Sequence, residues 1–120
     1  MRTHENLEVW KRGVDLVVEI YRLTEKFPTD ERFGLTSQLR RAAVSIPSNI
    51  AEGAARTFDK EFLYFLSNSQ GSASEASTQL LIAVRLGYIS EKSYSDIRPR
   101  FDELGRMLSG LINHVRSKAK

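Results

Sequence analysis

Apolar and small residues that alternate four and three positions apart over residues 62–87 constrain this chain more than any other feature. The series consists of Phe62, Leu66, Ser69, Ala73, Ala76, Leu80, Ala83 and Gly87. Helices that pack along one another in a left-handed supercoil show this spacing. The series therefore predicts a long helix over residues 58–86 with a buried seam along its length.

Helical spacing recurs in three further segments, at residues 7–27, 33–55 and 90–117. Pro28 ends the first segment, and Gly87 with Ser90 separates the third from the fourth. No segment alternates apolar and polar residues as a half-buried strand does. We therefore predict an all-α fold, an up-down-up-down antiparallel four-helix bundle in one domain over residues 1–120.

Pro47 stands inside the apolar pattern of the second segment, where a proline costs about 3 kcal/mol because it removes a backbone donor and crowds the carbonyl of Ala43. Ser45, Ser48 and Asn49 could bond the backbone groups that the proline disturbs. We predict that the second helix is kinked at Pro47 and that these four residues shape an interface. Gly53 is available near the end of this helix.

The apolar residues of segment 7–27 cover an arc wider than one core-facing stripe. Either this helix is nearly surrounded inside the domain, or its second face packs against another copy of the chain. We favour the second interpretation, because a single four-helix bundle leaves part of each helix facing solvent.

Small residues dominate the middle of the third segment, at Gly71 to Ser77. They allow a neighbouring helix to approach closely, and we expect the first helix to settle there with Trp10 and Tyr21. The alternative is a ligand groove.

Residues suited to catalysis or to metal binding are sparse. The chain has no cysteine and two histidines, His4 and His114, neither of which stands in a Glu-x-x-His pair. No phosphate-binding glycine loop and no serine paired with a base can be recognised. We expect a protein that is not an enzyme and has no catalytic residue, metal or cofactor. The absence of cysteine and of a long apolar run favours a cytoplasmic protein without membrane contact.

Arginine accounts for 12 of the 18 basic residues, and the net charge is +3. Arginine suits bidentate contacts with phosphate. Our candidate nucleic-acid contacts are Arg40, Arg41, Arg56, Arg98, Arg100, Arg106 and Arg116. The alternative is a solvated charged surface. We see no interleaving of aromatic and basic residues, so we expect any RNA binding to be electrostatic and salt-dependent.

The residues of several segments, taken together, resemble one family. They are Leu7-Glu-Val-Trp10, Phe27-Pro28, the run from Gln38 to Gly53, Lys60-Glu61, Gly71-Ser72 and Leu86-Gly-Tyr-Ile89. The chain resembles the 23S rRNA intervening-sequence proteins, which are bacterial four-helix bundles. The resemblance implies assembly into a ring, with a homopentamer favoured, and a related branch serves as accessory proteins of diversity-generating retroelements.

Two functions follow from these observations. We favour a non-enzymatic homo-oligomer that associates with RNA or another nucleic acid through phosphate contacts. The alternative is a protein-interaction scaffold, or an accessory subunit of a reverse transcriptase, which has a protein partner and binds no RNA directly.

Overall fold

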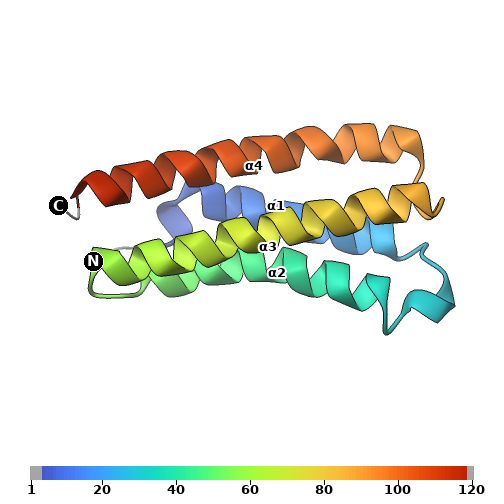
Figure 1. The fold of residues 1–120 in the computed structure, drawn as a ribbon, viewed down its shortest axis with the longest axis horizontal. Coiled ribbons are helices and arrows are strands. Elements are labelled where there is room, and N and C mark those ends of the chain that lie inside the picture. The colour runs from blue at the N-terminus through green and yellow to red at the C-terminus, as the bar shows by residue number, and fades with distance from the viewer. Residues whose placement is uncertain (1–3, 119–120) are drawn as a thin grey trace.

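The computed structural model describes residues 4–118 and contains four α-helices, with no strand in that range. The helices are α1 (Glu8–Thr24), α2 (Leu35–Ala54), α3 (Asp59–Arg85) and α4 (Glu91–Lys118), and two short 3-10 helices, η1 (His4–Asn6) and η2 (Thr29–Glu31), precede α1 and α2. The four helices lie side by side along the long axis of a molecule that measures 47 × 25 × 20 Å (Figure 1). The all-α class and the four helices expected from the sequence are confirmed.

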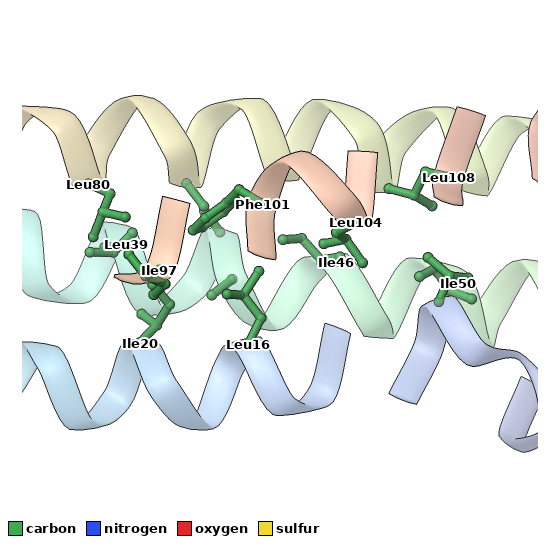
Figure 2. Close-up of a cluster of buried hydrophobic side chains, with 14 of the residues drawn as sticks. Leu16, Ile20, Leu39, Ile46, Ile50, Leu80, Ile97, Phe101, Leu104 and Leu108 are labelled. Atoms are coloured by element: carbon green, nitrogen blue, oxygen red, sulfur yellow. The ribbon is translucent and has the colours of Figure 1, made fainter. Parts of the chain in front are cut away.

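A single set of apolar side chains fills the space between the helices. The most extensive helix contact is that of α2 with α3. The contacts of α3 with α4 and of α1 with α2 are smaller, and the contact of α1 with α4 is the smallest among these four helix pairs. Figure 2 shows the middle of this core, to which α1 contributes Leu16 and Ile20, and α4 contributes Ile97, Phe101, Leu104 and Leu108. Each such leucine or isoleucine stabilises the fold by about 1.5–3 kcal/mol through its burial.

Pro47 is buried where α2 crosses α1. A Cβ atom added to Gly13 of α1 would lie 3.4 Å from the Cβ of Pro47, so the proline ring and the glycine allow close helix contact. Asn49 Nδ2 donates to the carbonyl of Ser45 at 2.8 Å, and Ser69 Oγ of α3 donates to the carbonyl of Ile46 at 2.9 Å. Two backbone carbonyls next to Pro47 are therefore bonded by side chains, one of them from the neighbouring helix.

Most of the small residues of α3 lie beside α4, and the expectation that α1 settles on them is wrong. Within residues 4–118, α1 contacts α2 and α4 but not α3, because α2 and α4 lie between the two. Gly71, Ser74 and Ser77 of α3 instead line an open groove of about 1140 Å³ together with Gly105 and Ser109 of α4. A groove therefore exists at these residues, and its use by a ligand stays a prediction.

Two glycines near helix ends have different functions. Gly53 is buried in the last turn of α2, where a Cβ would lie 2.8 Å from Phe65 Cβ and 2.9 Å from Phe62 Cδ1. Gly87 does end α3: its φ of 80° allows its N–H to bond Val84 and the N–H of Tyr88 to bond Ala83, both at 2.9 Å. Gly53 thus lies near the end of its helix, as the sequence indicates, and permits close packing of α3, whereas Gly87 supplies the positive φ that ends α3.

Candidate nucleic-acid interface

Arg40 is held between α1 and α2. Its Nε donates to Thr24 Oγ1 at 2.7 Å, its Nη2 donates to the carbonyl of Tyr21 at 3.3 Å, and its guanidinium lies 4.4 Å from the centre of the Tyr21 ring. Thr24 Oγ1 in turn donates to the carbonyl of Ile20. The guanidinium thus stabilises the packing of α2 on α1 and is only partly available to an outside ligand.

Arg100 forms an ion pair across the α1–α4 contact. Its Nη1 lies 2.8 Å from Glu19 Oε2, and a second pair, Arg12 with Glu103, joins the same two helices. The Arg12–Glu103 pair is exposed, and exposed pairs contribute about 0–1 kcal/mol each. The pair with Glu19 gives Arg100 a carboxylate partner within the chain.

Arg56 lies in the connection between α2 and α3. Its Nη2 is 3.6 Å from Glu52 Oε2, and its guanidinium carbon is 4.7 Å from the centre of the Phe65 ring. The cation therefore rests on an aromatic face, where cation–π attraction contributes about 0.5–1 kcal/mol at an exposed position.

The remaining four candidates are exposed, and in residues 4–118 none of them has a carboxylate within ion-pair distance. They are Arg41 on α2 and Arg98, Arg106 and Arg116 on α4. Arg98 and Arg116 are 18 residues apart, which is about 27 Å along a helix. The structure therefore does not gather the seven predicted arginines into one site, and these four cations lie apart on its surface.

A polar groove of about 610 Å³ surrounds Arg41 between α2 and α3. Gln38 and Ser45 of α2, and Ser72, Glu75 and Gln79 of α3, line it. Gln38, Arg41 and Ser45, spaced three or four residues apart on α2, thus form one wall of this groove. Ser48 is exposed beyond it, and within the described part of the chain neither Ser45 nor Ser48 makes a side-chain hydrogen bond.

An aromatic and basic cluster at the start of α3 was not found from the sequence. We call it the aromatic corner; it consists of Arg56, Lys60, Glu61, Tyr64 and Phe65, which line a hollow of about 430 Å³. Tyr64 is 63% exposed, and its ring centre lies 5.2 Å from that of Phe65 in an edge-to-face arrangement. Part of this cluster could have been found from the sequence, because Lys60 lies one helical turn from Tyr64, and Glu61 lies one turn from Phe65. No sequence pattern, however, shows that the connection between α2 and α3 brings Arg56 to them.

Among residues 4–118, no three histidine, cysteine, aspartate or glutamate side chains stand close enough to hold a metal ion. His4 packs edge-on against Trp10 with ring centres 4.9 Å apart, and His114 is exposed on α4. In the same range, no helix has the length and apolarity needed to cross a membrane.

Comparison with protein families gives a match to the 23S rRNA-intervening sequence protein family over residues 5–110. Comparison with curated protein sequences gives no match.

A solved structure with a similar fold is a protein of unknown function from the S23 ribosomal protein family of Bacteroides thetaiotaomicron. The two chains superpose with a TM-score of 0.80 over 88% of this chain and 95% of the other, and 23% of the aligned residues are identical. At this identity the comparison supports the fold and carries no residue-level function.

Proposed function

Because this chain belongs to the 23S rRNA-intervening sequence protein family, we propose that it is a non-enzymatic oligomer that associates with RNA through phosphate contacts. The observation that carries the proposal is the set of exposed arginines without a carboxylate partner in residues 4–118, namely Arg41, Arg98, Arg106 and Arg116. Guanidinium groups that are not neutralised within the chain can each release a counterion from RNA when they meet a phosphate.

Assembly would place several copies of these separate cations on one RNA. An apolar strip on α1 and α2 supports assembly: Val14, Val18 and Tyr21 of α1 and Val44 of α2 are 36–44% exposed. Val44 is one turn from Arg40 and from Pro47, which both contact α1, so it lies on the flank of α2 next to α1. We favour a homopentamer in which this strip meets a neighbouring copy.

The protomer that we propose is an up-down-up-down antiparallel bundle whose second helix is kinked at Pro47. The colour order of Figure 1 supports the antiparallel arrangement, since the chain reverses its direction along the long axis after each helix. We further propose that the protein works in a bacterial cytoplasm, which the absence of cysteine favours.

Salt-dependent RNA binding by charge-matched variants tests the proposed function. We expect the wild-type protein to bind single-stranded RNA at low salt and Arg41→Glu to bind it more weakly, with a salt slope smaller by about 0.7 for each phosphate that the variant fails to neutralise. Lys26→Glu, which changes an exposed cation outside the candidate set, is the matched control. Equal effects of the two substitutions would assign the binding to net charge alone, and binding that ignores salt would contradict the proposal.

A protein partner is the second candidate function, and a separate apolar surface favours it. Phe33 is 88% exposed, Ile82 44% and Leu86 54%, and all three lie near the end of the bundle where Tyr88 bonds Glu31. Such a surface suits a protein scaffold or an accessory subunit of a reverse transcriptase. To test this candidate, partners are recovered with the protein from cells before and after nuclease treatment. Recovery of the same single protein in both cases, and its loss with Phe33→Ala, would support a protein partner. Loss of every partner after nuclease treatment would support RNA.

A further inference from the structure

We propose that the aromatic corner binds one unpaired nucleobase of a single-stranded RNA, with Tyr64 as the stacking platform. This inference rests on the proposed RNA association and adds to it a base-contacting site and a preference for unpaired strands. Phosphate contacts alone imply neither.

The exposed ring of Tyr64 is available for stacking. It is 63% exposed on the first turns of α3, while the neighbouring Phe65 ring supports it edge-on at 5.2 Å. Phe65 in turn packs on the buried Gly53, where Phe65 Cβ comes within 2.8 Å of the position of a missing Cβ. The ring is therefore presented by a tightly packed helix junction, and an aromatic platform of this kind binds any base through its π face.

The polar groups around the hollow suit a nucleotide better than an apolar partner. Arg56 and Lys60 supply cations for the flanking phosphates, and Glu61 supplies an acceptor for an amino group on the edge of a base. Glu52 neutralises part of the charge of Arg56 at 3.6 Å. The corner is thus less positive than a phosphate site would be, so stacking must supply much of its affinity.

Double-stranded RNA would not use this site, because its bases are already stacked in the helix. The test therefore compares three probes of one length: a single-stranded oligoadenylate, the same strand with abasic riboses, and an RNA duplex. Their dissociation constants are measured for the wild-type protein and for Tyr64→Ala, Tyr64→Phe and Phe33→Ala, with helix content and assembly mass checked for each variant. Phe33→Ala removes a more exposed ring at the other end of the bundle and is the matched control.

We expect Tyr64→Ala to weaken oligoadenylate binding about 5- to 150-fold, the range for removal of one stacked base. Tyr64→Phe should bind like the wild type, and Phe33→Ala should too. Binding of the abasic strand and of the duplex should change less than about twofold in every variant. The ratio of the oligoadenylate dissociation constants of Tyr64→Ala and the wild type should stay constant between about 50 and 200 mM salt, because stacking releases no counterion. Both affinities should fall over this range.

Three results would overturn the inference: equal oligoadenylate binding by wild type and Tyr64→Ala, equal weakening of duplex and single strand, or a changed assembly mass in Tyr64→Ala, which would make the corner a contact between copies. In each of these cases RNA binding by the wild-type protein survives. If the wild-type protein binds none of the probes at low salt, the proposed function itself fails.

Discussion

Single residues without side-chain bulk decide how closely the helices approach. Gly13 lets the ring of Pro47 come against α1, and Gly53 lets Phe62 and Phe65 come against α2. At Gly71 and Gly105 nothing lies within 4 Å of an added Cβ, so these glycines are not required by packing in the described chain. The four positions therefore divide into two that permit close contact and two that face open space.

Gly53→Ala should destabilise the protein by up to about 2 kcal/mol. The added methyl must displace two aromatic side chains, at a cost of about 1–3 kcal/mol, which exceeds the gain of about 1 kcal/mol from the better helix propensity of alanine. Thermal unfolding measures the difference, and a fall in Tm of several degrees is expected.

Gly71→Ala is the matched control, because it adds the same methyl to a helix with no atom in the way. It should raise the stability by about 0.5–1 kcal/mol. If both variants are stabilised alike, the short contacts at Gly53 do not constrain the fold.

The role of a glycine can be predicted from the sequence where it depends on neighbouring residues, and not where it depends on how helices pack. Gly87 followed by a capping Ser90 is a local signal, since a positive φ and the hydrogen bond from Ser93 N–H to Ser90 Oγ involve neighbouring residues only. The close packing of Gly53 depends on where α3 lies after the connection, which no spacing within α2 encodes. The aromatic corner was not predicted for the same reason, because Arg56 reaches Phe65 only once the chain has turned.

At the scale of the elements, a hydrogen bond joins the two connections at one end of the bundle. Tyr88, in the connection between α3 and α4, donates its hydroxyl to Glu31 Oε2 of η2 at 2.9 Å. Glu31 Oε1 also accepts the N–H of Leu35 at 3.1 Å and so holds the start of α2. One carboxylate thus links the beginnings of α2 and α4.

This hydrogen bond raises the pKa of Tyr88 above its ordinary value, and desolvation and the negative charges of Glu31 and Asp30 raise it further. The folded state therefore favours the protonated phenol. Its stabilising contribution is fully present below about pH 10, the unfolded value, and is lost as the pH rises through the higher folded pKa.

Tyr88→Phe should consequently lower the free energy of unfolding at neutral pH. At alkaline pH the free energy of unfolding of the variant should lack the part of the decline that ionisation of Tyr88 causes in the wild type. Denaturant unfolding at several pH values measures both effects. Parallel alkaline declines in wild type and variant would show that the Tyr88–Glu31 bond does not contribute to stability.

The buried face of each helix was easier to predict from the sequence than the helix that packs against it. Spacings of three and four residues identify the seams of α3 and α4 because each is a property of one segment. Which helix packs on a seam depends on the whole bundle. The small residues of α3 were therefore predicted to pack against the bulky residues of α1, whereas most of them lie beside α4. Of the predicted arginines, Arg40 and Arg100 turned out to be bonded to α1, since charge alone does not reveal an internal partner.

At the scale of the whole molecule, the exposed apolar strip of Val14, Val18, Tyr21 and Val44 predicts self-association. Light scattering of the nuclease-treated protein should give a mass about five times the 13.7 kDa of one chain, and Val18→Asp should reduce it, because a carboxylate would be buried at the interface without a partner.

Ile82→Asp is the matched control, since Ile82 and Val18 are both 44% exposed and Ile82 lies on α3. Its mass should remain that of the wild type. An unchanged mass for Val18→Asp, or a monomeric wild-type protein, would contradict assembly through α1 and α2.

The start of α1 and the end of α4 lie at the same end of the long axis as the α2–α3 connection (Figure 1). A bulky label that precedes α1 or follows α4 would therefore share this end of the bundle with the proposed base-binding site, so loss of RNA binding in a protein labelled there would not by itself contradict the proposal. The connection at Gly87 lies at the far end of the bundle, so a label placed in it would leave the aromatic corner accessible.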